Sequence, residues 1–149
     1  MSREEDILYD FIESDRIWPP IFMADMKHVF VRALTDVLVR IPDEVYDMVT
    51  NRVNFVVEDP RIHAINVPFS RYCPPSAEGH YVQFETIVVF HQLLAYPFNA
   101  LVGALAHEIA HSFVSGEDFR SDEEKVDALV LEWGFRKELE AAHVQMNRK

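Results

Sequence analysis

Cysteine, glycine and positive charge are all scarce in this chain of 149 residues. The single cysteine, Cys73, excludes an intramolecular disulfide framework. Only four glycines are present and no low-complexity run occurs, so we expect an ordered domain and not a disordered segment. Fourteen basic residues against 25 acidic ones give a formal net charge of −11. This charge disfavours nucleic acids and anionic membrane surfaces as partners.

Long hydrophobic runs are also missing. The most apolar stretch, Leu93 to Ala106, is interrupted by Asn99 and is too short to span a bilayer. The first six residues are too acidic for a secretory signal peptide, so we expect a cytoplasmic protein. Hydrophobic residues still make up 49% of the chain. That share is enough to build one domain, residues 1–149, around a core that needs no disulfide.

Apolar residues at helical spacing predict helices at both ends of the chain. The predicted helices span residues 4–13, 21–40, 43–50, 97–115 and 121–142. Prolines stand just before the second of these segments and at the first turn of the fourth, where the missing N–H costs nothing. The chain therefore begins and ends with helices.

The middle of the chain has the composition of strands. β-Branched and aromatic residues predict strands over residues 53–57, 62–67 and 81–90. Residues 68–79 hold three prolines and a glycine, which predicts a loop. The expected fold class is α+β, with a small three-stranded sheet, mixed or antiparallel, packed against long helices.

One segment, His107-Glu108-Ile109-Ala110-His111, has the residue types and the spacing of a metal site. Histidines four positions apart on a helix lie about 40° apart on one face, so both imidazoles can reach one ion. Neutral imidazole is a zinc ligand, and catalytic zinc has three protein ligands and a water. Glu108, beside the first histidine, is placed to take a proton from that water.

The surroundings of Glu108 strengthen this interpretation. It is the only carboxylate between Thr86 and Gly116, in an almost wholly apolar helix, so we expect it to be buried. A buried carboxylate without a partner is costly, and a metal site offsets that cost. The alternative is a core helix in which the two histidines only form hydrogen bonds.

A third ligand is expected on the last predicted helix. Val114 and Glu117 stand where a metzincin pattern would continue with glycine and histidine. On a helical wheel Glu123 lies about 20° from the inward-facing direction and Glu124 about 80° from it. Glu123 is therefore the predicted ligand. Asp127, one turn later on the same face, is predicted to orient a ligand histidine through its other ring nitrogen.

Other roles for these acidic residues stay open. Ser121 and Glu124 have the spacing of a capping box, which gives Glu124 a structural role. Glu123 and Asp127 also suit a first helical turn, where the helix dipole favours acidic side chains. Glu117 and Asp118 are the reserve candidates for the third ligand.

The pattern His107-Glu108-x-x-His111 followed by Glu123-x-x-x-Asp127 resembles the gluzincin group of zinc peptidases. The short spacing between its two halves is most similar to that of the minigluzincins. The resemblance implies a small zincin-like domain with N-terminal backing helices, a small sheet, an active-site helix and a C-terminal glutamate helix. It also implies a Zn²⁺ ion held by the two histidines and Glu123, and hydrolysis of peptide bonds with Glu108 as general base.

The resemblance covers residues 81–135 well and residues 1–80 only in the order of their elements. The strand predicted at 81–90 matches the strand at the cleft edge in that group, where an extended peptide substrate can pair. A plain core strand is the alternative.

Two other functions remain in view. The first is a catalytically weak or inactive zinc-binding module of the same fold that acts in protein–protein interaction or sensing, with a fourth protein ligand closing the coordination sphere. The second is an interaction domain without metal. Four other histidines have no ligand spacing and are interpreted as surface or loop residues: His63, His80, His91 and His143.

Overall fold

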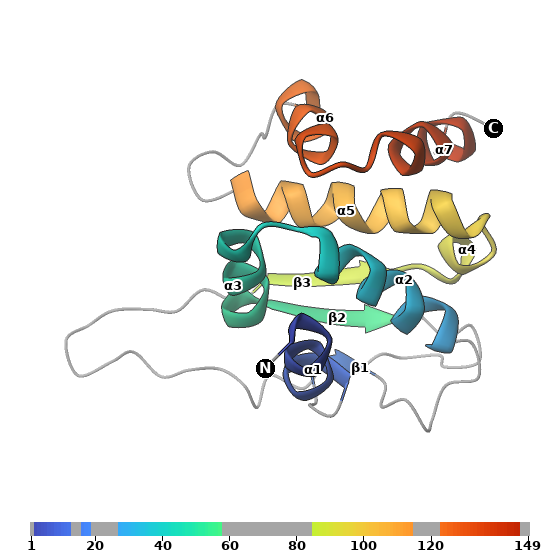
Figure 1. The fold of residues 1–149 in the computed structure, drawn as a ribbon. Coiled ribbons are helices and arrows are strands. Elements are labelled where there is room, and N and C mark those ends of the chain that lie inside the picture. The colour runs from blue at the N-terminus through green and yellow to red at the C-terminus, as the bar shows by residue number, and fades with distance from the viewer. Residues whose placement is uncertain (1, 13–15, 19–26, 58–84, 115–122, 147–149) are drawn as a thin grey trace.

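The computed structural model describes residues 2–12, 16–18, 27–57, 85–114 and 123–146 (Figure 1). The helices are α1 (Arg3–Ile7), the π-helical turn η1 (Leu8–Ile12), α2 (Lys27–Arg40), α3 (Asp43–Arg52), α4 (His91–Leu94), α5 (Phe98–Val114), α6 (Glu123–Glu132) and α7 (Arg136–Met146). The strands are β1 (Ile17–Trp18), β2 (Val53–Val57) and β3 (Glu85–Val89). The chain thus combines helices with a small sheet, which confirms the mixed α and β composition that the sequence predicts.

Helix α5 runs through the middle of the molecule (Figure 1). The sheet, α2 and α3 lie on one side of it, and α6 and α7 lie on the other. Residues 100–107 of α5 are all buried, as expected for a helix that is apolar on every side. Because α5 is covered from both sides, the side chains near its C-terminal end can meet residues from α6 and α7.

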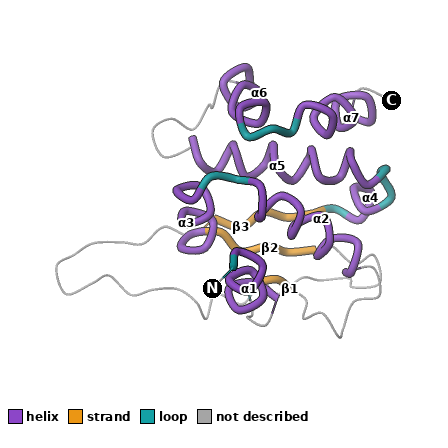
Figure 2. Tube along the Cα trace, viewed as in Figure 1, coloured by secondary structure: helices purple, strands orange, loops and turns teal. Residues whose placement is uncertain are grey.

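The strands lie in the order β1-β2-β3 (Figure 2). Both described pairings are parallel, with Val53 opposite Glu85 and Val57 opposite Val89. The expectation of a mixed or antiparallel sheet is therefore wrong for these strands. Between two parallel strands the chain must cross back to the end of the sheet at which the first strand begins. Strand composition does not reveal such a crossover. The strand expected at 62–67 and the loop at 68–79 lie outside the described residues.

Aromatic side chains join the N-terminal segment to the sheet and to α2. Phe55 on β2 packs edge-to-face against Phe11, with ring centroids 6.1 Å apart, and against Phe30, at 5.7 Å. All three rings are fully buried. The core is therefore continuous from η1 through β2 to α2.

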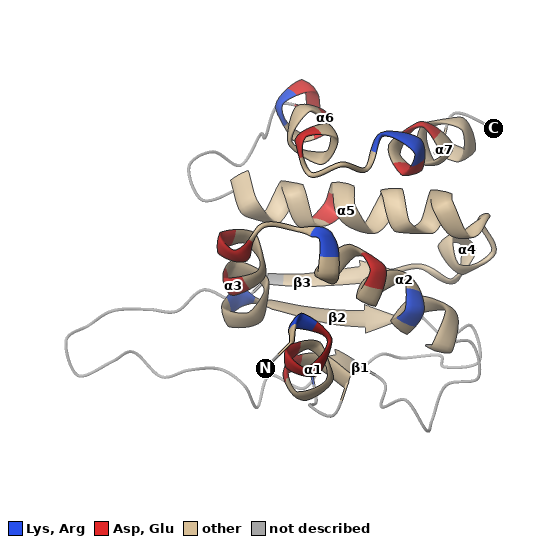
Figure 3. Cartoon of the chain, viewed as in Figure 1, with Lys and Arg blue, Asp and Glu red and all other residues tan. Residues whose placement is uncertain are grey.

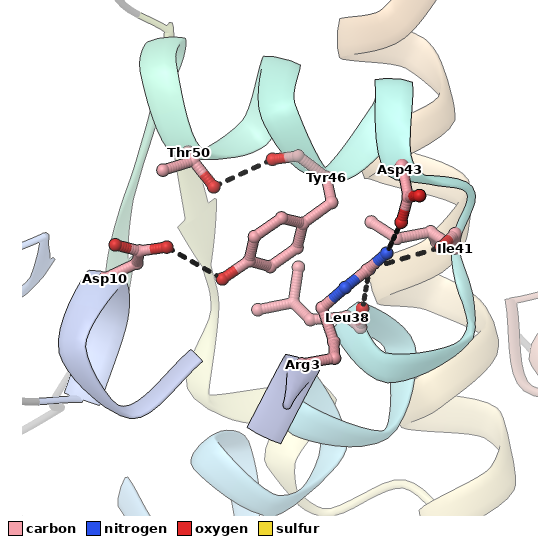
Figure 4. A network of polar contacts seen from close by, with 7 residues as sticks. All are labelled: Arg3, Asp10, Leu38, Ile41, Asp43, Tyr46 and Thr50. Atoms are coloured by element: carbon pink, nitrogen blue, oxygen red, sulfur yellow. Dashed lines mark hydrogen bonds and ion pairs between the residues drawn. The ribbon is translucent and has the colours of Figure 1, made fainter. Parts of the chain in front are cut away.

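Arg3 fastens α1 to the corner between α2 and α3 (Figure 4). Its guanidinium donates hydrogen bonds to the carbonyl oxygens of Leu38 (2.8 Å) and Ile41 (3.3 Å) and forms an ion pair with Asp43. It also lies 4.4 Å from the ring centroid of Tyr46. Carbonyls near a helix C-terminus lack intrahelical partners, so a cationic side chain there stabilises the helix end.

Tyr46 makes a second link to the N-terminal segment (Figure 4). Its hydroxyl donates a 2.9 Å hydrogen bond to Oδ2 of Asp10, while Thr50 donates to the Tyr46 backbone carbonyl. Burial, and then the hydrogen bond to Asp10, hold the pKa of Tyr46 far above its usual value of 10.0. The phenol is therefore kept protonated in the folded protein.

The predicted helix over 121–142 is wrong as a single element, because the chain breaks it into α6 and α7 at Gly134. Gly134 has φ of 93°, a left-handed conformation that suits glycine. The N–H of Phe135 donates to the carbonyl of Val130 (3.2 Å), and the N–H of Gly134 to that of Leu131 (3.0 Å). These two bonds form a Schellman motif, which ends α6.

Most other elements follow the sequence prediction. The helix expected at 43–50 is α3, the strand at 53–57 is β2, and the helix at 97–115 is α5. Neither the short helix α4 nor the two-residue strand β1 was predicted. Within the parts of the chain that the structure describes, no helix has both the length and the apolar character needed to cross a membrane.

Candidate metal centre

The two histidines of α5 converge, as their one-turn spacing predicts. Nε2 of His107 and Nε2 of His111 lie 3.0 Å apart, and the rings meet edge-to-face at 80°. His107 is buried and His111 is half-buried. Both rings therefore direct the same nitrogen toward one point at the end of the buried helix.

Glu123, the first residue of α6, brings a carboxylate to that point. Its Oε2 lies 3.1 Å from Nε2 of His107, and its Oε1 lies 3.1 Å from Nε2 of His111. The side chain is 68% exposed, so the carboxylate approaches the histidines from the solvent side. Glu124, its neighbour, is not a member of this group, which agrees with the helical wheel drawn from the sequence.

The geometry of the group fits a metal ion. Two ligands of a tetrahedral zinc ion, with bonds of about 2.0–2.1 Å, lie roughly 3.3 Å apart. The distances between neighbouring donor atoms here are 3.0 and 3.1 Å. Two imidazole nitrogens and a carboxylate are also donors that zinc accepts. His107, His111 and Glu123 can therefore hold a metal ion.

The alternative, a simple hydrogen bond between the two histidines, does not explain why the Glu123 carboxylate lies close to both Nε2 atoms. A neutral imidazole offers one N–H and one lone pair, and a carboxylate is an acceptor only. If one histidine donates to the other through Nε2, the Nε2 that accepts has no proton left for Glu123. A shared cation satisfies all three groups at once.

Asp127 lies on the other side of the His107 ring. Its Oδ1 is 3.2 Å from Nδ1 of His107, although the two atoms are not aligned as a hydrogen bond, and this buried oxygen has no hydrogen-bond partner among the described residues. Nε2 of His107 faces the metal group while Nδ1 faces Asp127. This is the arrangement in which a carboxylate fixes the tautomer and the orientation of a ligand histidine.

Glu108 is exposed, so the expectation that it is buried is wrong. It is the one acidic residue on α5, which carries no lysine or arginine (Figure 3). The hydropathy of the surrounding helix suggests burial, but position 108 faces a pocket instead of the core. The metal is therefore not needed to offset a buried charge, and the carboxylate is accessible to water.

The pocket beside Glu108 has a volume of about 310 Å³. His107 and Glu108 contribute to its wall. The apolar side chains that line it are Phe90, Leu93, Tyr96, Ala104 and Met146. Phe90 is 53% exposed and Met146 is 51% exposed. An apolar cavity thus lies directly beside a histidine of the metal group.

His143 on α7 is the residue near this centre that sequence reasoning missed. Its side chain is 44% exposed, as the interpretation as a surface histidine expects, but its Nε2 also lies 3.5 Å from Oδ2 of Asp127. No local spacing could have shown this contact, because it depends on the break at Gly134 that separates α7 from α6. His63, His80 and the reserve ligands Glu117 and Asp118 lie outside the described residues, as does Ser121.

Close packing of α7 on α5 explains how His143 reaches Asp127. A Cβ at Gly103 would collide with the carbonyl oxygen of Glu138 and lie 3.0 Å from the backbone nitrogen of Leu139. Arg40 on α2 holds the start of α7 by donating to the carbonyl of Gly134 (2.7 Å) and pairing with Glu138 (2.9 Å). The backbones of α5 and α7 therefore touch one turn before His107.

Comparison with known proteins finds no matching protein family, no similar curated protein and no similar solved structure. The case for a function therefore depends on the geometry of the site and on the residues of the motif.

Proposed function

We propose that this protein is a zinc-dependent peptidase, and that it resembles the gluzincins in its chemistry as well as in its motif. The observation that carries the proposal is the convergence of three metal-ligand side chains, His107, His111 and Glu123, beside a pocket that also contains Glu108. Ligand atoms from two separate helices meet within hydrogen-bonding distance of one another, although 11 residues separate the histidines from Glu123 along the chain.

The zinc ion, Glu108 and Asp127 have different roles in the proposed reaction. A zinc ion supplies Lewis acidity, which makes water a better nucleophile and polarises a carbonyl group. Glu108 accepts the proton of the attacking water and passes it to the leaving amine. Asp127 holds the ring of His107 in the tautomer whose Nε2 is free to bind metal.

The pocket indicates the kind of substrate. Its apolar lining, with Phe90 and Met146 partly open to solvent, fits an apolar side chain of a peptide or protein better than a charged one. Such a side chain would lie next to Glu108 and His107, so the adjoining peptide bond would be near the metal. We therefore expect a preference for a large apolar residue beside the cleaved bond.

The alternative, a zinc-binding module without hydrolysis, calls for a fourth protein ligand. Within the described residues, the group of candidate ligands has three members. Three protein ligands suit a catalytic site, in which the next position is kept for water or substrate.

The test is peptide cleavage by the zinc-loaded protein and by a Glu108→Gln variant. Glutamine keeps the size of the side chain and removes the base, so zinc content should stay near normal while cleavage is lost by ~10²- to 10⁴-fold, the usual contribution of a general base. Glu124→Gln is the matched control, because Glu124 is also exposed but lies outside the metal group. Equal cleavage by the native protein and the Glu108→Gln variant would show that Glu108 is not the base.

A further inference from the structure

We infer that His143 is a positioning residue of the metal centre, which acts on His107 through Asp127. The inference rests on the metal-binding part of the proposed function, and it adds a third helix, α7, to a centre otherwise built from α5 and α6.

The observation is a carboxylate held between two imidazoles. Oδ1 of Asp127 faces Nδ1 of His107 at 3.2 Å, and Oδ2 faces Nε2 of His143 at 3.5 Å. Asp127 is half-buried, whereas the side chain of His143 is 44% exposed. His143 therefore covers the outer side of the carboxylate and leaves its inner side to the ligand histidine.

The carboxylate needs both partners. A buried carboxylate oxygen without a hydrogen-bond donor costs free energy, and Oδ1 of Asp127 has no hydrogen bond among the described residues. His107 can donate through Nδ1, because its Nε2 faces the metal group. A donor on Oδ2 then stops the carboxylate from rotating away from the ring, and His143 is the histidine that the structure places there.

The packing of α7 makes this contact specific. Gly103 lets the α7 backbone lie directly on α5, and Arg40 fixes the first residues of the helix. The distance of 3.5 Å is long for a hydrogen bond. Donation to Oδ2 therefore calls for a small rotation of the partly exposed imidazole. His143 thus acts on the metal only by way of Asp127.

A double-mutant cycle on zinc affinity tests this inference. Zinc dissociation constants would be measured by competitive chelator titration for the native protein, His143→Ala, Asp127→Asn and the double variant. We expect Asp127→Asn to weaken binding ~10- to 100-fold, the usual effect of losing an outer partner of a ligand, and His143→Ala to weaken it by less, roughly three- to tenfold. In the Asp127→Asn background, His143→Ala should cause no further loss.

Two further variants separate positioning from general damage to α7. His143→Gln keeps an N–H near the position of Nε2 and should retain most of the affinity. Val144→Ala changes an exposed neighbour on the same helix and should leave the affinity unchanged. The melting temperature of the metal-free protein should be the same for His143→Ala and His143→Gln.

The outcomes are distinguishable. Native zinc affinity in His143→Ala, or losses that simply add in the double variant, would overturn the role of His143 while leaving the metal centre intact. Failure of the native protein to bind zinc would overturn the metal centre itself.

Discussion

Glu123 and Glu124 are neighbours on the first turn of α6, yet only Glu123 reaches the histidines. Successive residues of a helix point about 100° apart, so the two carboxylates cannot face the same way. The buried residues Val126 and Val130 mark the inward face of α6, and Glu123 lies three positions before the first of them. This choice could be predicted from the sequence because it depends only on helix periodicity.

Substitution of the two glutamates should therefore give opposite results. Glu123→Gln removes a charged ligand and should weaken zinc binding strongly, because zinc prefers a carboxylate to a neutral amide. Glu124→Gln should leave the metal in place and cost at most about 1 kcal/mol of stability through a lost helix-terminal contact. Chelator titration measures the zinc affinity of both variants. Loss of zinc in Glu124→Gln but not in Glu123→Gln would exclude Glu123 as the ligand.

Other residues of the site could not be predicted from sequence, and the reasons are physical. Glu108 lies in an apolar helix, but hydropathy does not show that position 108 faces a pocket between α5, α4 and α7. His143 lies near Asp127 because α6 ends at Gly134 and because α7 packs on α5 at Gly103. Both outcomes depend on tertiary packing, which local patterns do not contain.

At the scale of elements, the close contact between α5 and α7 brings His143 near Asp127. The two helices pack so closely at Gly103 that any side chain there meets the backbone of α7. A glycine in a helix interior normally costs about 0.5–1 kcal/mol relative to alanine. At position 103 glycine is required in spite of this cost, because a larger residue would prevent the close packing.

The sign of the effect of Gly103→Ala tests this contact. A Cβ there should push α7 away and destabilise the protein by about 1–3 kcal/mol, as overpacking does. It should also weaken zinc binding, since α7 carries His143. Chemical denaturation and chelator titration measure the two effects. A variant more stable than the native protein would contradict the packing, because it would show the ordinary gain from alanine in a helix.

The hydrogen bond between Tyr46 on α3 and Asp10 on η1 predicts that the stability of the fold depends on pH. The pKa of Tyr46 is raised in the folded state, so the folded protein keeps a proton that the unfolded chain loses as the pH rises above about 10. The stability that this group contributes is fully present below that pH and is lost above it. Urea unfolding at pH 9 and at pH 10.5 should therefore show that the free energy of unfolding falls more for the native protein than for Tyr46→Phe. Equal losses would contradict the raised pKa.

At the scale of the whole molecule, the order of most helices and strands could be predicted, but strand β1, helix α4, the break between α6 and α7 and the sheet topology could not. Strands β2 and β3 have the expected residue types, and their parallel direction is set by the path of the chain between them. The metal motif itself comes from one helix and the start of another, so periodicity was sufficient to find it. The arrangement of α6 and α7 over α5 required the structure (Figure 1).

Because the proposed ligands come from both α5 and α6, zinc should stabilise the whole fold. A ligand that binds only the folded state adds about 2.7 kcal/mol at a free concentration of 100 times its dissociation constant. Thermal unfolding with zinc and with excess chelator should therefore differ by several degrees. His107→Ala should remove the response to zinc. An equal response in that variant would place the stabilising ion elsewhere.

The most direct measurement is the zinc content of the purified protein, by elemental analysis after dialysis. We expect about one zinc ion per chain in the native protein, because one group of three ligands is present among the described residues. The double variant His107→Ala, His111→Ala should retain almost none. Full zinc occupancy in that double variant, or a native protein that holds no zinc after being supplied with it, would contradict the metal centre.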